Sequence, residues 1–554
     1  MARDLRGTRA RVGVLAGAAA AALLALPGVA NAAVTSTVAG GVLTVNSTAD
    51  DAITITCAID KVKVNGADPG TGPADCAAIT SIDVHGGPGA NAITLTGVTT
   101  AAFPAVASVA IDGAAGNDTI AGSERVDSML GGDGNDRISG DDNPAGTRDD
   151  FRGQAGDDTL VWNPGDDDDL VEGGDGADTV EVNGGGGAEN FTVKPSATAG
   201  RVQFDRDAAS AGGAFNIDIG TSERLDMNAN GGDDTFAADN GLAALGFKLD
   251  VDGGDGNDSL DGGDGADLIA GGNGDDRIVG DDNPLNTRDD ARGGAGNDTM
   301  VWNPGDDDDI NEGGDGADTV EVNGAGGAEN FTVKPSATAG RVRFDRDAAS
   351  AGGAFNIDIG TSENLHLNAG GGDDRIHGSN GLAGLITSTL NGDDGNDRIK
   401  GTDGGDVLSG GAGFDFIRAR DKAADAVECG TGIDVALVDE RDTVRACELV
   451  LGGLLRVAPV GTAKLVGNAV ALKLRCVAGE RCTGKVRLRG GDRTLGGKRF
   501  SLDGGDPKQI LVKLNRRGRH VLAGGKIARI KLRIDARDQQ GNGWRSTARI
   551  KLKR

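Results

Sequence analysis

The chain has 554 residues, of which 96 are glycine and 85 are Asp or Glu, and its formal net charge at pH 7 is −29. Aromatic residues make up only 3% and tyrosine is absent, so the composition excludes a thick core built from large side chains. Disorder is the simplest interpretation of an acidic, glycine-rich chain. The glycines nevertheless keep a strict register with Ile, Leu and Val, which favours an ordered repeat.

The N-terminal segment, residues 1–32, is typical of a secretory signal peptide. Four arginines precede an apolar run over residues 12–26, and the small-residue site Ala30-Asn31-Ala32 follows. The apolar run is short for a membrane span, and no later stretch reaches about 18 apolar residues. We therefore expect no transmembrane segment and a secreted, extracellular mature chain, with association at the cell surface as an alternative.

Six cysteines fall into three close pairs: Cys57 with Cys76, Cys429 with Cys447, and Cys476 with Cys482. An even number of cysteines in an exported chain favours three disulfides, although fifteen pairings are formally open. Zinc or redox chemistry is a weaker alternative because no CxxC motif is accompanied by a histidine.

The charge changes sign abruptly along the chain. Residues 33–455 carry a net charge of −52, whereas residues 456–554 carry +20. Such an inversion marks a domain boundary. The predicted organisation is a signal peptide over 1–32, an N-terminal β region over 33–112, a repeat solenoid over 113–428, a disulfide-stapled cap over 429–455 and a basic domain over 456–554.

A long duplication lies within the acidic part. The segment that begins at Arg148 recurs from Arg288, an offset of 140 residues, and the match continues through AENFTVKPSATAGRV and FNIDIG. Such self-similarity is the mark of a stacked array. The AENFTVKPSATAGRV and FNIDIG stretches alternate apolar and polar residues, so we predict wider strand-bearing turns of the same solenoid.

A finer period of nine residues runs inside each block. GGDGNDSLD, GGDGADLIA and GGNGDDRIV follow one another without a gap over residues 253–279. Glycines at positions one, two and four permit sharp turns, and the apolar residue at position eight belongs to a short strand that faces the interior. A slender Ile, Leu and Val stack then replaces a thick core.

This nonapeptide resembles the hemolysin-type, or RTX, calcium-binding repeat GGxGxDxUx, in which U is a large apolar residue. The resemblance implies an all-β protein with a parallel β-roll, in which two nonapeptides make one turn and each Ca²⁺ lies between turns. Repeat n then meets repeat n+2, so the loops of Asp258 and Asp276 are expected to share a site. Ca²⁺ is a hard cation that prefers carboxylate and carbonyl oxygens.

The predicted metal ligands are the aspartates at position six: Asp118, Asp136, Asp158, Asp178, Asp258, Asp267, Asp276, Asp298, Asp318, Asp397, Asp406 and Asp415. A single such aspartate could be an ordinary turn residue, but many in register favour metal binding. The concentrated negative charge would be countered by bound ions. We expect the array to be poorly ordered without calcium and compact with it.

Several stretches depart from the pattern. The repeat at Gly122 keeps Asp127 but loses two of the three glycines, and the repeat at Gly86 has Asn91 where aspartate is expected. Two GDDNP segments, each followed by TRDD, interrupt the frame, and we predict outward loops there and no ion sites. The chain also combines an N-terminal peptide with a basic C-terminal domain, so the usual RTX export route and a toxin role are not expected.

The basic domain shows alternating Val, Leu or Ile with Lys or Arg, which predicts a small antiparallel β-sandwich. Its charge has three interpretations: solvated strands without a partner, contact with anionic cell-envelope polymers, or contact with nucleic acid. No aromatic ladder accompanies the basic residues, so nucleic acid is not expected.

The sequence does not favour an enzyme. None of the four histidines lies in HExxH, and no GxSxG motif is present. A β-helix enzyme that cleaves acidic polysaccharides is a remaining alternative, in which Arg201, Arg341 and Arg343 could act. The main prediction is a secreted calcium-binding protein, and the second is a calcium-dependent surface adhesin or matrix protein.

Overall fold

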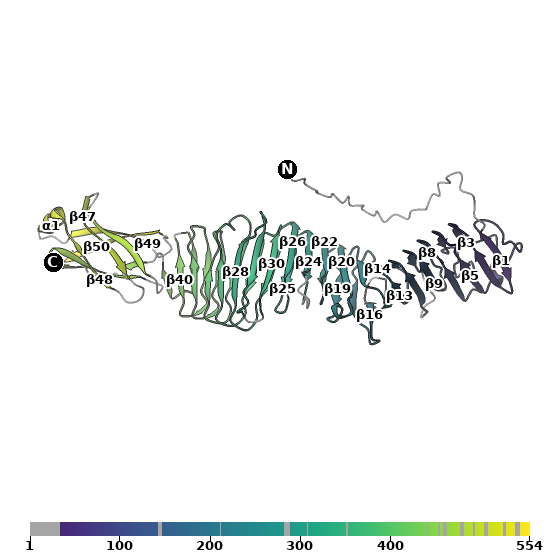
Figure 1. Ribbon diagram of the computed structural model, residues 1–554. Coiled ribbons are helices and arrows are strands. Elements are labelled where there is room, and N and C mark those ends of the chain that lie inside the picture. The colour runs from purple at the N-terminus through teal and green to yellow at the C-terminus, as the bar shows by residue number, and fades with distance from the viewer. Residues whose placement is uncertain are drawn as a thin grey trace, which may run out of the picture.

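A computed structural model describes residues 34–553, except for residues 142–146, 211, 282–287, 307, 351–352, 440, 452–454, 458–462, 477–480, 491–492, 503–507, 524–527 and 538–542. The predicted signal peptide and its cleavage site therefore lie outside the described residues. The acidic part is a long coil of β-strands, and the basic part is a separate small β-domain (Figure 1). The fold prediction of an all-β solenoid followed by a small antiparallel domain is confirmed.

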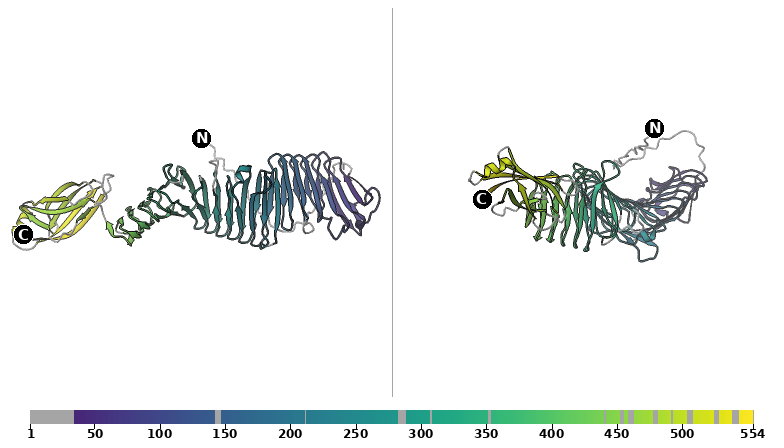
Figure 2. Two further views of the ribbon diagram at one scale, coloured as in Figure 1. Left: turned by 90° about the horizontal axis from the view of Figure 1, so that it is seen from below. Right: turned by 60° about the vertical axis from the view of Figure 1, so that its left-hand side comes forward.

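Two long sheets face each other along the coil (Figure 2). Sheet I contains, in spatial order, β1 (Thr35–Ala39), β2 (Val42–Asn46), β5 (Ser81–His85), β7 (Ser108–Asp112), β9 (Val126–Asp133), β11 (Asp149–Ala155), β13 (Asp169–Asp175), β17 (Phe215–Gly220), β16 (Arg201–Arg206), β15 (Asn190–Pro195), β19 (Thr235–Ala238), β21 (Ser259–Asp261), β23 (Arg277–Val279), β25 (Thr299–Trp302), β27 (Thr319–Asn323), β31 (Asn364–Asn368), β33 (Thr387–Asn391), β35 (Val407–Ser409), β38 (Ala426–Glu428) and β41 (Thr443–Arg445).

Sheet II alternates with sheet I along the chain. It contains, in spatial order, β4 (Lys61–Val64), β3 (Ala52–Ala58), β6 (Ala92–Thr94), β8 (Thr119–Ala121), β10 (Arg137–Ser139), β12 (Thr159–Trp162), β14 (Thr179–Asn183), β18 (Arg224–Asn228), β20 (Lys248–Asp255), β22 (Leu268–Asn273), β24 (Asp290–Ala295), β26 (Asp309–Asp315), β30 (Phe355–Gly360), β29 (Val342–Arg346), β28 (Asn330–Pro335), β32 (Arg375–Gly378), β34 (Arg398–Lys400), β37 (Phe416–Ala419), β40 (Val435–Val438) and β42 (Leu449–Leu451). The two-residue strands β36 (Ala412–Gly413) and β39 (Thr431–Gly432) and the short 3₁₀ turns η1 (Cys76–Ala78) and η2 (Ala243–Leu245) complete the coil.

Apart from β1 and β4, which pair antiparallel with β2 and β3, and from the two excursions described below, each strand pairs in parallel with the strand one full turn away. β21 pairs with β23, so that Leu260 lies opposite Ile278, while Ile269 in β22 belongs to the other sheet. All three of these side chains are buried. The parallel ladders begin at β2 and β5, so the region before residue 113 belongs to the same coil. This arrangement explains why one apolar residue in nine is enough to build the core.

The two long copied stretches form antiparallel excursions within the sheets. In sheet I, β16 runs antiparallel to β15 and β17, and the outer two strands continue the parallel ladder. The second copy repeats this arrangement with β28, β29 and β30, but in sheet II. Successive strands of the coil alternate between the two sheets. The 140-residue offset contains an odd number of such changes, so the second copy lies in the other sheet.

The described residues of the C-terminal domain form eight strands and one short helix. These are β43 (Leu455–Val457), β44 (Ala463–Val466), β45 (Ala469–Cys476), β46 (Cys482–Gly490), β47 (Arg493–Leu502), β48 (Lys508–Lys513), α1 (Arg516–Ala523), β49 (Ala528–Arg537) and β50 (Gly543–Lys553). The pairing is antiparallel except between β44 and β50. Within the described part of the chain, no helix has the length and apolar character of a membrane span.

Two of the three predicted disulfides are present, Cys57–Cys76 and Cys429–Cys447. The first joins β3 to η1 near the start of the coil, and the second joins its last turns. The predicted Cys476–Cys482 bridge lies among residues whose side chains are outside the described set.

Candidate metal centre

The loops that connect the sheets form two edges of the coil. We call the loops from sheet I to sheet II edge I, and the loops from sheet II back to sheet I edge II. Sixth-position aspartates stack along these edges in three rows. The N-terminal row on edge I is Asp118, Asp136, Asp158 and Asp178; the middle row on edge II is Asp234, Asp258, Asp276, Asp298 and Asp318; the C-terminal row on edge I is Asp374, Asp397, Asp415 and Asp434.

Within a row, each aspartate is held by the backbone of the previous turn. The backbone N–H of Asp258 donates to Asp276 Oδ1 at 2.9 Å, and the N–H of Asp276 donates to Asp298 Oδ1 at 2.9 Å. The expected meeting of the Asp258 and Asp276 loops is therefore seen, with Asp267 on the opposite edge. This bond fixes the orientation of the carboxylate but uses only one of its two oxygens.

The second carboxylate oxygen is the notable feature of the rows. In all thirteen row aspartates, Oδ2 is inaccessible to solvent and has no hydrogen-bond partner among the described residues. The side chains themselves are at most 2% exposed. A buried carboxylate without a partner for its charge is strongly unfavourable, so each Oδ2 requires a cation or a proton.

Burial raises the pKa of these carboxyl groups, which favours their protonated form. Loss of solvation raises the pKa of Asp136, Asp276 and Asp397 to about 7, although the backbone hydrogen bond partly opposes the shift. Neighbouring row carboxylates raise these pKa values further. A cation between the turns would offset both effects, because its positive charge stabilises the ionised carboxylates.

In the row loops that begin with glycine, this residue leaves room beside the carboxylate oxygen that has no partner. A methyl group added at Gly253 would overlap Asp258 Oδ2 and would lie 2.6 Å from the carbonyl oxygen of Gly271 in the next turn. The same relation recurs at Gly392, with Asp397 Oδ2 and the carbonyl oxygen of Gly410 at 2.7 Å. The space is thus bounded by a carboxylate and a carbonyl oxygen, which is suitable chemistry for a hard cation.

The fourth glycine has a different role. Gly256 has φ +143°, a conformation that side chains rarely adopt, and a Cβ there would collide with the carbonyl oxygen of Gly232 in the previous turn. This position therefore sets the close spacing of the turns. It explains the regularity of glycine at that point of the repeat.

Two rows begin with a glutamate that is neutralised by the protein itself. Glu189 precedes Asp234 in the middle row, and its Oε1 accepts a hydrogen bond from Arg206 at 2.6 Å. Both side chains are almost completely buried, and the guanidinium lies over the rings of Trp162 and Phe215. Glu329 and Arg346 repeat this arrangement at the start of the C-terminal row.

Other departures from the repeat also bring a hydrogen-bond donor. Asn91 stands one turn before Asp118, and its amide nitrogen donates to Gly87 O, Gly113 O and Asp118 Oδ1. On edge II, the Ser123 hydroxyl donates to Asp127 Oδ1 at 2.9 Å. Thr402 donates in the same way to Asp406 at 2.8 Å. In the Ser123 and Thr402 loops, the hydroxyl and the backbone N–H of one residue together satisfy both carboxylate oxygens, including the Oδ2 that has no partner in the rows.

The predicted ligands divide accordingly. Ten of the twelve lie in the rows, whereas Asp267 and Asp406 lie on the opposite edges. Asp267 keeps an unpartnered, buried Oδ2, but both oxygens of Asp406 accept hydrogen bonds from Thr402. Asp234, Asp374 and Asp434 were absent from the predicted ligands, because their loops lack the first glycine, which is replaced by Ala229, Ala369 and Cys429. The fourth glycine, the aspartate and the apolar eighth residue remain as a signal.

The TRDD segments were predicted to lie in outward loops, but the first aspartate of each segment belongs to the stacked coil. Asp127 N donates to Asp149 Oδ1 at 2.7 Å, and Asp267 N donates to Asp289 Oδ1 at 2.9 Å. Both TRDD aspartates therefore occupy stacked positions on the edge opposite the local row. Burial, followed by repulsion from Asp309, raises the pKa of Asp289 to about 9.

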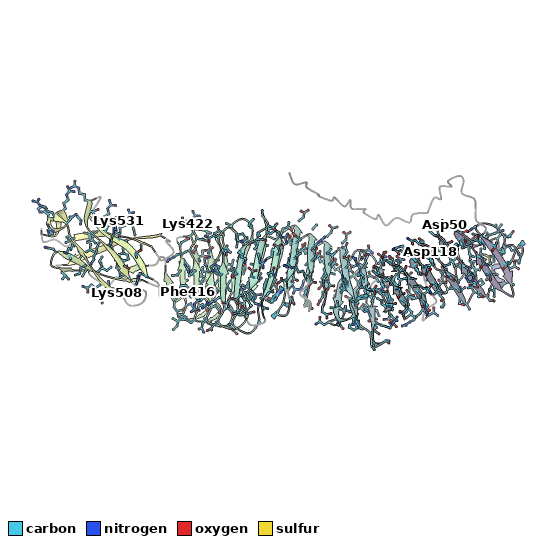
Figure 3. The ribbon with its side chains drawn as sticks, viewed as in Figure 1. Asp50, Asp118, Phe416, Lys422, Lys508 and Lys531 are labelled. Atoms are coloured by element: carbon cyan, nitrogen blue, oxygen red, sulfur yellow. A yellow bond between two sulfur atoms is a disulfide. The ribbon has the colours of Figure 1, made fainter. Side chains whose placement is uncertain are left out.

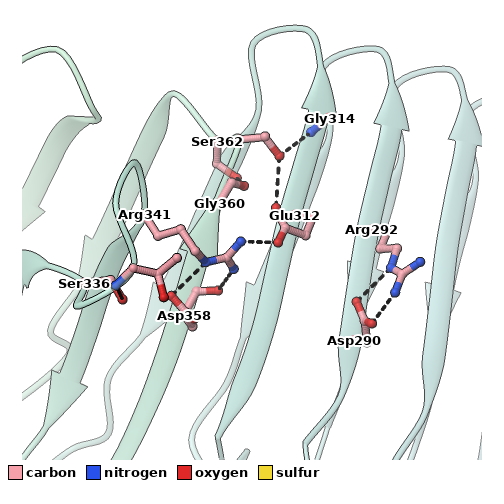
Figure 4. Close-up of polar contacts among 11 residues, drawn as sticks. Asp290, Arg292, Glu312, Gly314, Ser336, Arg341, Asp358, Gly360 and Ser362 are labelled. Carbon is pink, nitrogen blue, oxygen red and sulfur yellow. Dashed lines mark hydrogen bonds and ion pairs between the residues drawn. The ribbon is translucent and has the colours of Figure 1, made fainter. Parts of the chain in front are cut away.

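The arginines considered for catalysis are engaged in ion pairs. Arg341 bonds to Glu312 and Asp358, which connects neighbouring turns (Figure 4). Arg201 makes the equivalent contacts with Glu172 and Asp218 in the first copy. Arg343 pairs with Asp345 at 2.6 Å.

Comparison with known families agrees with the geometry. Four segments, residues 112–143, 252–283, 360–381 and 387–417, match the RTX calcium-binding nonapeptide repeat. Together they cover about a fifth of the chain. The chain therefore carries calcium-binding RTX repeats. A search of curated proteins gave no match.

Proposed function

We propose that this is a secreted calcium-binding protein in which Ca²⁺ between successive turns drives the folding and stiffness of an extracellular solenoid. The thirteen buried Oδ2 atoms without partners are the observation that carries the proposal. Export is supported by the N-terminal segment of the sequence and by two disulfides, which are typical of oxidising compartments. The role is one of binding, and catalysis forms no part of it.

The row aspartates and the neighbouring glycine carbonyls would hold the ion. Bound Ca²⁺ supplies positive charge and accepts oxygen ligands from both turns. The chain contributes the preformed orientation, since the bond from the previous turn fixes one carboxylate oxygen and directs the other inward. Because these pockets exist only when turns are stacked, binding and folding are coupled.

A matched pair of variants tests this proposal. Asp276→Asn removes the charge of a row ligand, whereas Asp275→Asn removes the same charge from an exposed neighbour. Hydrogen exchange of the full chain should show that Asp276→Asn raises the calcium concentration needed to protect residues 268–279 by about tenfold or more. Asp275→Asn should behave as the wild type. Equal calcium responses in both variants would contradict the proposal.

For the basic domain, we propose contact with anionic polymers of the cell envelope, which is also the basis of the adhesin alternative. Arg487 and Arg489 on β46 lie opposite Arg533 and Lys531 on β49, while Val486 and Leu488 between them are buried. Lys485 and Lys531 are exposed. Figure 3 shows Lys508 and Lys531 on this domain and Asp118 on the solenoid.

Sedimentation with isolated envelopes tests the contact. The double variant Lys485→Glu and Lys531→Glu should lose binding at low salt, because electrostatic attraction depends on the charge of the face. The double variant Lys508→Glu and Lys513→Glu makes the same charge change on β48 and should retain more binding. Equal loss in both variants would indicate attraction by net charge alone.

A further inference from the structure

A second kind of metal site is present near the C-terminal end of the coil, on edge II. Asp406 precedes β35, Asp425 precedes β38, and Asp421 lies in the turn between β37 and β38. One carboxylate oxygen from each lies within 4.8 Å of the other two. Because Ca–O distances are about 2.3–2.6 Å, one ion can contact all three.

The unpartnered oxygens indicate that this cluster is more than a group of surface acids. Asp425 is 2% exposed; its Oδ1 accepts the N–H of Asp406 at 3.0 Å, and its Oδ2 is inaccessible and has no partner among the described residues. Asp421 shows the same division, since Oδ1 accepts the N–H of Ala423 at 2.6 Å and Oδ2 is inaccessible without a described partner. Two inaccessible carboxylate oxygens therefore require a cation or a proton at this point.

The protein provides no ion pair for this charge within the described residues. Lys400 lies close enough for Asp406 and Asp421 to oppose the lowering of its pKa by burial, but its Nζ donates to the carbonyl oxygen of Gly378. Asp403 and Asp442 add further negative charge around the cluster. Burial raises the pKa of Asp442 and Arg420 opposes that shift, whereas the charged neighbours that shift the pKa of Asp421 and Asp425 are carboxylates.

We propose that Asp406, Asp421 and Asp425 form a carboxylate site for a divalent cation, Ca²⁺ in an extracellular setting, which anchors the last turns of the coil. It differs in construction from the row sites. Asp421 and Asp425 belong to the sequence RDKAAD, which has no glycine, and both lie beyond the family match that ends at residue 417. The site uses two carboxylates from one turn and a third from the turn before, and the disulfide Cys429–Cys447 follows directly.

Hydrogen exchange of the full chain under calcium titration can distinguish this site from the rows. In the wild type, peptides over residues 416–428 should gain protection with calcium. Asp421→Asn should raise the required calcium concentration by about tenfold or more, since loss of even an outer-shell partner of a metal ligand typically costs about 10–100-fold in affinity. Peptides over residues 253–279 should be unaffected.

Asp403→Asn is the matched control. Asp403 lies in the loop of Asp406, but its carboxylate accepts N–H groups from Gly381, Leu382 and Ala383. This variant should keep the calcium response of residues 416–428. Asp425→Asn provides a second ligand variant should Asp421→Asn fail to fold.

The outcomes separate the two proposals. If calcium protects residues 253–279 but Asp421→Asn and Asp425→Asn leave the response of residues 416–428 unchanged, the carboxylate site is wrong and the rows stand. If calcium protects neither region, the row proposal is wrong as well. Loss of protection restricted to residues 416–428 supports the site.

Discussion

The rows and the antiparallel excursions solve one electrostatic problem in two ways. Asp258 and Glu189 each stand immediately before a strand and belong to the middle row of hydrogen bonds. Asp258 Oδ1 accepts the N–H of Asp234, and the N–H of Glu189 donates to Asp234 Oδ1. Glu189 receives Arg206, which the excursion carries into the core, whereas Asp258 leaves Oδ2 without a partner. Within the excursion the chain itself supplies the cation that neutralises a buried carboxylate, whereas in the rows the proposed Ca²⁺ would supply it.

Calcium removal should produce the largest difference between the rows and the excursions. With a chelator present, row peptides over residues 253–279 should lose hydrogen-exchange protection, because thirteen buried carboxylates lose their counter-ions. Peptides over the excursions, residues 190–206 and 330–346, should retain protection longest. Circular dichroism should report an accompanying loss of strand content. Uniform loss along the coil would show that the arginine-paired rungs have no independent stability.

Acidification should partly replace calcium in the calcium-free protein. Burial raises the pKa of Asp158 and Asp374 to about 6 and that of Asp276 to about 7, above the ordinary value near 3.8. A raised pKa means that the folded state binds protons more tightly, so this stabilisation is complete at low pH and is lost as pH rises through 6 to 7. The metal-free coil should therefore show more strand signal at about pH 5.5 than at pH 8. A signal that increases from pH 5.5 to pH 8 would contradict the assignment.

Most of the fold could be predicted from the sequence, because glycine and the apolar eighth residue report local geometry directly. Ten row aspartates could be found for the same reason. Asp234 and Asp374 could not, since only the fourth glycine is required for close stacking and the leading pair can vary. The pairing of Glu189 with Arg206 could not be predicted from the sequence either. Arg206 follows 17 residues later and reaches Glu189 only because its strand folds back antiparallel against the preceding one.

Breaking the arginine pair should have a large but local effect. Arg206→Leu leaves Glu189 buried without its partner, which typically costs about 3–5 kcal/mol. Arg152→Leu is a suitable control, because its ion pair with Asp150 is half exposed and is worth about 1 kcal/mol or less. Hydrogen exchange of residues 185–206 should distinguish the two variants in the presence of saturating calcium. Similar exchange in both would mean that the pair adds no stability to its rung.

The loops in which a hydroxyl donates to the aspartate should show the smallest change in stability on substitution. Ser123 donates through its hydroxyl to Asp127 Oδ1, and its N–H donates to Oδ2 at 2.6 Å. Ser123→Ala removes one buried hydrogen bond and should lower stability by about 1–2 kcal/mol, whereas Ser128→Ala removes an exposed hydroxyl and should change little. Thermal melts at several calcium concentrations can separate the contributions. If the hydroxyl substitutes for an ion, the loss in Ser123→Ala should shrink as calcium rises, because the emptied space beside Asp127 can then accept the cation that its neighbours in the rows require. A loss independent of calcium would show that the Ser123 hydroxyl has a structural role and that no ion replaces it in this loop.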